Sequence, residues 1–164
     1  MPDDLVALYR WHDGIDSKAT ANLFYGMVFE SAGDVARRMQ GFGESRMALK
    51  YADPGIDPGY MLASRRIPIG NDSAHCFLCV DLEPTSEGRV GQVILIDEEY
   101  RVALKLCDSV SELVVSFARD LGQGKYTLAQ DAREDGDDWL DPERSIDAIN
   151  WFNSPTWARA HGVR

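Results

Sequence analysis

Three strand-like segments follow one another in the middle of the chain, and they constrain the fold more than any other feature. In chain order they are HCFLCVDL (75–82), QVILIDE (92–98) and YRVALKL (100–106). In the last segment, large apolar residues such as Val102 and Leu104 alternate with smaller or charged ones such as Ala103, a pattern typical of a half-buried antiparallel strand. The tight connection before it predicts a hairpin. The run as a whole therefore predicts a mostly antiparallel meander.

Helical patterns precede this run of strands. The segment PDDLVALYRWHDG (2–14) repeats apolar residues at helical spacing. Ser31, with Asp34 three residues later, predicts the N-terminal cap of a second helix through DVARRMQ. Between the two, NLFYGMVFE (22–30) is rich in aromatic and branched residues, which indicates an extended segment. We expect helix, strand and helix before the meander.

A further helix is predicted after the strands. Ser109 and Glu112 form a second capping box. The residues behind it have the clearest amphipathic pattern in the chain, formed by Val110, Leu113, Val114, Phe117 and Leu121. We expect this helix to cover the sheet. The order of elements predicts an α+β domain, a mostly antiparallel sheet with helices packed on it.

The last part of the chain has a different composition. Residues 131–147 contain eight acidic residues against two arginines. Three of the four tryptophans also lie in this part, namely Trp139, Trp151 and Trp157. We divide the chain into a domain at 1–126 and an acidic, Trp-containing C-terminal extension at 127–164. The aromatic side chains predict that the extension docks onto the domain, with a short helix near Pro142 to Phe152.

The charge of the chain restricts its binding partners. The formal net charge is −10 and the sequence pI is about 4.7. A nucleic-acid binder needs basic residues to neutralise phosphates, and adhesion to anionic lipid needs them too, so we expect neither partner. A basic protein partner is compatible with this charge. The N-terminus does not resemble a signal peptide, and three cysteines without framework spacing predict a cytoplasmic protein.

Cys76 and Cys79 form a C-x-x-C pair beside His75, which raises the question of a metal or redox site. Side chains alternate along a strand, so the two cysteines should point to opposite faces, with His75 on the face of Cys79. Such a pair cannot hold one ion or close a disulfide unless the strand bends. A structural zinc site needs four ligands, and the sequence has no second pair. We interpret both as core cysteines and expect no metal or cofactor.

The sequence has no motif that indicates an enzyme. His12, His75 and His161 are scattered, and none has a ligand partner at helical spacing. The nucleophile-elbow, P-loop and dinucleotide-binding patterns are missing. The acidic run lacks the order of a calcium loop, since Pro142 stands where a glutamate would be needed after Gly136. We expect a non-enzymatic protein whose acidic run is a solvated face or, alternatively, a partner-docking surface.

Three stretches are distinctive when taken together: PDDLVALYRWHDG, IPIGNDSAHCFLCVDL and GRVGQVILIDEEYRVALKLCDSVSELVVSFARDLGQGKY. In this order they resemble the SUKH superfamily, which includes a yeast regulator of cell-wall glucan synthesis and many bacterial immunity proteins. Members of that family usually carry another amphipathic helix before the first stretch, whereas this sequence starts at Met1. We therefore expect exposed apolar surface near Leu5, Leu8 and Tyr9, covered by the C-terminal extension, by a second copy of the chain or by residues outside this sequence.

The resemblance implies a binding protein without catalysis. Bacterial members are mostly immunity proteins, which neutralise toxins that are often basic nucleases. We expect a monomer or homodimer that binds a basic toxin. The alternative is a binding module or regulatory scaffold for an endogenous partner. The candidate contact residues are Asp135, Asp137, Asp138, Trp139 and Asp141 in the acidic run, with the loop acids Asp72 and Glu83.

Overall fold

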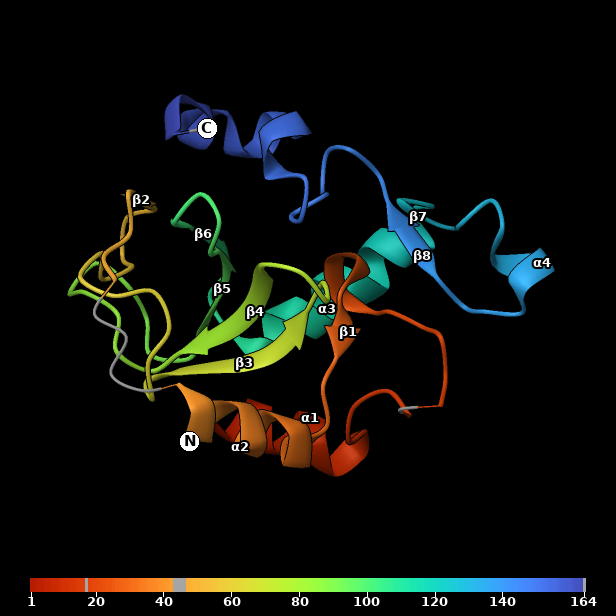
Figure 1. Cartoon of the computed structure of the whole chain (residues 1–164), viewed down its shortest axis with the longest axis horizontal. Helices are drawn as coiled ribbons and strands as arrows, with labels where there is room; N and C mark the ends of the chain where they lie inside the picture. The colour runs from red at the N-terminus through yellow and green to blue at the C-terminus, as the bar shows by residue number, and fades with distance from the viewer. Residues whose placement is uncertain (17, 43–46, 164) are drawn as a thin grey trace.

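A computed structural model describes residues 1–16, 18–42 and 47–163 of the chain (Figure 1). Its helices are α1 (Asp3–Trp11), α2 (Ala32–Gly41), α3 (Val110–Gly122) and α4 (Ala132–Asp135). Its strands are β1 (Val28–Phe29), β2 (Tyr51–Ala52), β3 (Arg66–Asn71), β4 (Cys76–Asp81), β5 (Gln92–Asp97), β6 (Val102–Cys107), β7 (Tyr126–Leu128) and β8 (Leu140–Pro142). Short 3-10 helices lie at η1 (Phe24–Gly26), η2 (Trp151–Asn153) and η3 (Pro155–Val163).

The predicted meander forms the centre of a six-stranded sheet with the order β1-β3-β4-β5-β6-β2. All neighbouring pairs are antiparallel except β2 and β6, which are parallel. Strands β7 and β8 form a separate antiparallel pair. The helices pack around the sheet, with α2 against β3 and α3 against β5 and β6. The prediction of an α+β fold with a mostly antiparallel sheet is confirmed.

Both faces of the sheet are covered, which corrects the prediction of a half-buried last strand. One face of β6 carries Val102 and Leu104 into the main core with α1, α3 and the C-terminal extension. The other face carries Ala103 into a second core, beneath the segment that contains Ile56 and Leu62. Val102, Ala103 and Leu104 are all fully buried. Alternation in the sequence indicated one buried face, but a small alanine also fits beneath a packed loop.

The predicted capping boxes are confirmed. The Ser31 hydroxyl accepts a hydrogen bond from the Asp34 N–H at 3.2 Å, and the Ser109 hydroxyl accepts one from the Glu112 N–H at 3.1 Å. Helix α3 covers the sheet through Val110 and Leu113. Its predicted apolar face is wrong at Leu121, which is 39% exposed. The buried residue of that turn is Asp120, whose carboxylate lies 3.1 Å from the Lys125 ammonium group.

The expectation of uncovered apolar surface at the N-terminus is wrong for Leu5 and Leu8, which are buried in the main core. Helix α1 packs against α3, and the Asp4 carboxylate accepts a hydrogen bond from the Ser111 N–H at 2.9 Å. The large apolar residue that α1 exposes is Trp11. The first turn of α3 therefore lies over α1, while the C-terminal 3-10 helices lie on the β6 side of the sheet (Figure 1).

The C-terminal extension docks through its aromatic residues, as predicted. Trp151 and Trp157 are buried in the main core, and the Trp151 indole N–H donates to the Asp97 carboxylate at 2.9 Å. Arg159 forms an ion pair of 2.8 Å with Asp53, which is buried. The predicted helix near Pro142 to Phe152 is wrong, because Pro142 ends strand β8 and the helical turns follow from Trp151. The division at residue 126 stays a prediction.

The segment at 22–30, predicted to be extended, contains a 3-10 turn before the short strand β1. Tyr25 and Gly26 have φ angles of 56° and 79° there, which interrupt an extended path. The phenol of Tyr126, a residue of the C-terminal β7–β8 pair, accepts a hydrogen bond from the Tyr25 N–H at 3.2 Å. The aromatic composition thus reflects burial of a turn, since Phe24 contributes to the main core.

Candidate functional site

The turn between β3 and β4 is organised by side-chain oxygens that accept backbone hydrogen bonds. Asp72 Oδ1 accepts from the N–H groups of Ala74 and Cys76, both at 2.9 Å. Asn71 Oδ1 accepts from the Ser73 N–H at 2.8 Å, and Ser73 has a φ angle of 63°. These bonds replace ladder partners that the turn lacks. They also fix the Asp72 carboxylate at this end of the sheet.

Asn22 holds the backbone next to Trp139 by bonding Leu140, although the two bonded residues are 118 positions apart in the chain. The Asn22 side chain accepts from the Leu140 N–H at 2.7 Å and donates to the Leu140 carbonyl at 2.9 Å. It also donates to the Gly26 carbonyl at 3.0 Å. Asn22 is buried, so this clamp is shielded from water and holds the start of β8 against the domain.

The β3–β4 turn and the start of β8 border a hollow of about 370 Å³, which we call the acidic hollow. It is lined by three aspartates, Asp72, Asp141 and Asp147, together with Trp139 and apolar or neutral residues. Among the described residues that line it, none is lysine or arginine. The hollow therefore combines negative charge with an aromatic surface, an arrangement suited to a cationic group.

A second hollow of about 680 Å³ adjoins the first, and Trp139 lines both. Four of its charged residues form two ion pairs, and Asp16 lines it as well. Arg38 bonds the buried carboxylate of Glu30, with Arg38 Nε 3.0 Å from Glu30 Oε1, and Arg37 pairs with Asp34. The Arg38 guanidinium keeps its charge, since its hydrogen bond to Glu30 raises its pKa. The two arginines thus offset the carboxylates of Glu30 and Asp34, whereas the described lining of the acidic hollow contains no lysine or arginine.

The structure brings some of the predicted contact residues together and separates others. Asp72, Trp139 and Asp141 line the acidic hollow. Asp137 and Asp138 directly precede Trp139 in the chain, and the Asp137 carboxylate accepts a hydrogen bond from the backbone N–H of Trp139 at 3.2 Å.

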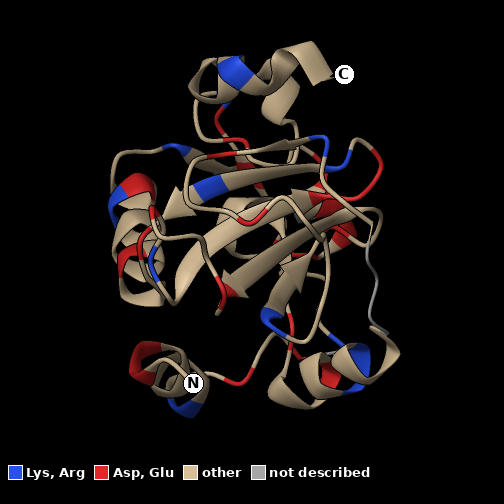
Figure 2. Cartoon of the chain, turned by 90° about the vertical axis from the view of Figure 1, so that its left-hand side faces the viewer, with Lys and Arg blue, Asp and Glu red and all other residues tan. Residues whose placement is uncertain are grey.

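Asp135 lies in α4, and its side chain is exposed. Glu83 follows β4, whereas Asp72 precedes it, so the two loop acids lie at opposite ends of that strand. Asp147 also lines the hollow but was not selected from the sequence, where it was one acid among eight. Figure 2 shows charged residues of both signs on the loops and helices around a sheet that is largely uncharged. A contact role for these residues stays a prediction.

Cys76 and Cys79 lie on opposite faces of the sheet, as predicted. Cys76 belongs to the main core and Cys79 to the second core, and both thiols are free and fully buried. Burial raises the pKa of both thiols, and the carboxylates of Asp97 and Asp72 raise that of Cys76 further. A cysteine nucleophile needs a lowered pKa and access to substrate. The surroundings of Cys76 provide neither.

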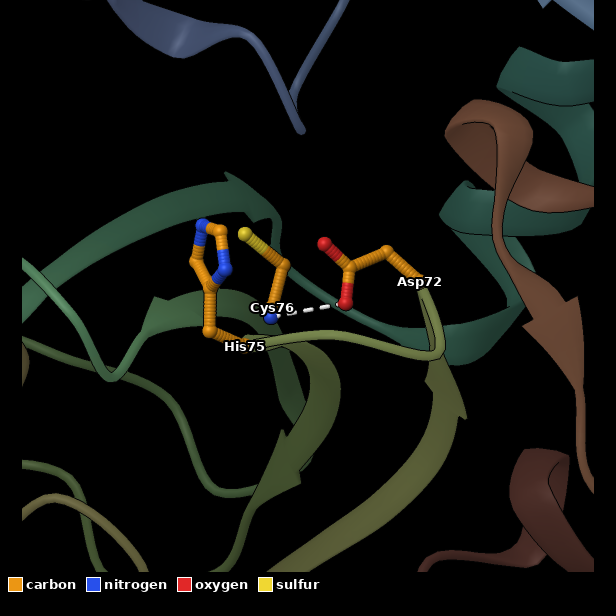
Figure 3. A group of neighbouring side chains, drawn as sticks. All are labelled: Asp72, His75 and Cys76. Atoms are coloured by element: carbon orange, nitrogen blue, oxygen red, sulfur yellow. Dashed lines mark hydrogen bonds between the residues drawn. The ribbon is translucent and has the colours of Figure 1, made fainter.

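Asp72, His75 and Cys76 form a cluster that was not predicted from the sequence (Figure 3). One ligand atom from each residue lies within 4.8 Å of the other two. Alternation had assigned His75 to the face opposite Cys76, and this assignment was wrong because β4 begins only at Cys76. His75 belongs to the preceding turn, where the two-residue period of a strand does not apply. Their closeness along the sequence was the only available signal.

The comparison with known families decides which proteins this chain is related to. The model of the SMI1 / KNR4 family (SUKH-1) matches residues 1–116. The chain belongs to this family. The resemblance recognised in the sequence is thereby confirmed, and this family includes regulators of cell-wall synthesis and SUKH immunity domains.

Curated relatives in yeasts support the same assignment. The chain is 31% identical over 91 residues to a KNR4/SMI1 homolog of Yarrowia lipolytica, which is 56% of this chain and 11% of that protein. It is 31% identical over 96 residues to a KNR4/SMI1 homolog of Eremothecium gossypii, which is 58% of this chain and 12% of that protein. The chain thus spans a small part of these relatives. Among its described residues, no helix has the length and apolar character that a membrane crossing requires.

Proposed function

We propose that this SUKH-family chain is a non-catalytic, cytoplasmic immunity protein that binds a basic toxin and blocks the toxin's active site. The observation that carries the proposal is the acidic hollow, in which Trp139 lies beside the carboxylates of Asp72 and Asp141. An indole attracts cations over its face, and tryptophan is among the residues that contribute most to protein interfaces. A lysine or arginine side chain of the toxin is the group that fits this surface.

The acids around the hollow have a distinct role in this proposal. Asp135, Asp137 and Asp138 lie on the same segment as Trp139 and add negative charge next to it. Long-range charge attraction speeds the encounter of two proteins, whereas buried aromatic contacts slow their separation. Neutralising these three acids should therefore lower mainly the association rate. The same rate should fall as salt rises past roughly 0.15 M, where the Debye length is about 8 Å.

The experiment is coexpression and purification with the product of the neighbouring gene. The chain should protect cells from that product and form a complex with it in solution. Trp139→Ala should weaken the complex by about 2 kcal/mol or more, which is roughly thirtyfold in Kd. Trp11→Ala is the matched control, since Trp11 is 75% exposed on α1, away from the hollow.

Two results would contradict this proposal. A complex that is equally tight with Trp11→Ala and Trp139→Ala would place the contact elsewhere. Protection by a chain that forms no complex would argue against occlusion of the toxin.

The second candidate function is a binding module for an endogenous partner. It is favoured by the similarity to KNR4/SMI1 homologs of yeasts. The genomic context distinguishes the two functions, because an immunity protein requires a toxin gene beside its own. If the neighbouring product is harmless to cells and does not bind the chain, the endogenous function becomes the better proposal.

A further inference from the structure

The cluster at the β3–β4 turn combines three different metal-ligand types. The imidazole of His75 and the carboxylate of Asp72 lie on either side of the Cys76 sulfur (Figure 3). Both backbone hydrogen bonds to Asp72 fall on Oδ1, and the other carboxylate oxygen lies on the side of the sulfur. The turn thus holds one oxygen, one nitrogen and one sulfur atom within 4.8 Å of one another.

This geometry is close to that of a bound transition metal. Ligand atoms around a tetrahedral zinc ion lie about 3.5 Å apart, given metal–ligand distances of about 2.0–2.3 Å. The upper bound of 4.8 Å in the cluster exceeds that value by about 1.3 Å, so the ligand atoms must move closer together by up to that distance. Cys76 is fixed in the strand and Asp72 is held by the turn. His75 is half-exposed, and a change of rotamer that gives up its 3.6 Å contact with the Glu99 carboxylate can provide the contraction.

The charge around the cluster favours a cation. Besides Asp72 in the cluster, Asp97 is the partner of Cys76 in the β4–β5 ladder, so a second acidic residue lies near the sulfur. Negative charge beside a site attracts a divalent ion. Asp72 also lines the acidic hollow, so one residue of the cluster reaches the surface there.

We propose that Asp72, His75 and Cys76 form a binding site for a zinc-like transition-metal ion, with a water molecule in the fourth coordination position. A set of one sulfur, one nitrogen and one oxygen suits zinc or cobalt and excludes a preference for magnesium or calcium, which prefer all-oxygen sites. As the sulfur–metal bond forms, the thiol proton leaves to solvent, and water completes the tetrahedron.

The test uses the purified, reduced full chain after treatment with a chelator. Titration with Co²⁺ should produce a thiolate-to-cobalt charge-transfer band at stoichiometric metal, together with the visible bands of a tetrahedral ion. Zn²⁺ should bleach both by competition. His75→Ala and Asp72→Ala should each weaken binding by roughly tenfold or more, since even residues that only orient ligands contribute that much. His75→Ala alters a half-exposed turn residue and should leave the fold intact.

Cys79→Ala is the matched control for Cys76→Ala, because both cysteines are fully buried in the same strand but on opposite faces. The charge-transfer band should vanish in Cys76→Ala and persist in Cys79→Ala. If Cys76→Ala fails to fold, His75→Ala and Cys79→Ala still decide the question. The proposal is overturned if the chain gives no charge-transfer band, if the band survives His75→Ala at full affinity, or if it depends on Cys79.

Discussion

Replacing Trp151 with alanine should remove a buried contact that joins the C-terminal extension to the domain. The indole is fully buried and packs against Tyr100 and Phe152, with ring centroids 6.1 Å and 6.0 Å away. Its N–H donates to Asp97 at 2.9 Å, and that carboxylate is 2% exposed. The substitution therefore opens a cavity in the main core and also removes the partner of a buried acid.

The magnitude follows from these two losses. Truncating a buried tryptophan to alanine costs about 3–5 kcal/mol through lost contacts and the cavity that remains. A buried acceptor that loses its donor costs about 1–3 kcal/mol. The two values overlap, because measured truncations already include some lost polar contacts, so we expect about 4–6 kcal/mol in total. For a chain of this size, that corresponds to a fall in Tm of roughly 10–20 °C.

Urea unfolding followed by far-ultraviolet circular dichroism measures this change without relying on tryptophan fluorescence. Trp151→Phe separates the two losses, since it keeps most of the ring and should cost about 1.5–3 kcal/mol for the hydrogen bond to a charged group. Trp11→Ala is the control, expected within about 0.5 kcal/mol of the parent because Trp11 is 75% exposed. Equal urea midpoints for Trp151→Ala and Trp11→Ala would refute a structural role of the extension in the core.

Three further outcomes are expected. Phe117→Ala should lower the free energy of unfolding in urea by about 2–3 kcal/mol, less than for a fully buried phenylalanine, because Phe117 is only half-buried. Leu121→Ala, at an exposed position, should lower it by about 0.5 kcal/mol or less. Equal costs would contradict the observed face of α3. Deleting residues 139–164 removes both core tryptophans of the extension and should abolish the cooperative transition; a shortened chain of parent stability would contradict the docking. Burial raises the pKa of Tyr126 from 10.0 to about 12, so the folded chain keeps the phenol protonated to a higher pH than the unfolded chain does. The resulting stability is fully present below pH 10 and is lost between pH 10 and about 12. In Tyr126→Phe, the free energy of unfolding should fall less steeply with pH over this range. An unchanged slope of that free energy against pH would assign the loss to other groups.

The C-terminal extension links the stability of the chain to its candidate site. Trp151 and Trp157 complete the main core, while the preceding residues of the same segment carry Trp139, Asp141 and Asp147 to the acidic hollow. Asn22 connects this segment to the domain, because its side chain bonds the backbone of Gly26 and of Leu140, and both residues line the hollow. Substitutions in the core of the extension are therefore expected to disturb the hollow as well.

Local sequence patterns predicted the elements that depend on neighbouring residues. The capping boxes at Ser31 and Ser109 form because a hydroxyl bonds an N–H three residues away, so the pattern contains the whole interaction. The opposite faces of Cys76 and Cys79 follow from strand alternation in the same way. The predicted helix near Pro142 failed because that residue pairs with Tyr126 in β7, a partner that no local pattern identifies.

The sequence by itself determined the α+β class, the family, the central antiparallel strands and the acidic, aromatic character of the C-terminal extension. Only the tertiary structure decided which acids meet, because Asp72 and Asp141 come from separate parts of the chain, and Asn22 bonds Leu140, the neighbour of Asp141. It also decided that Glu83 lies at the other end of β4 and that His75 turns toward Cys76. The physical reason is that caps and alternation are properties of adjacent residues, whereas a hollow depends on contacts between residues far apart in the chain.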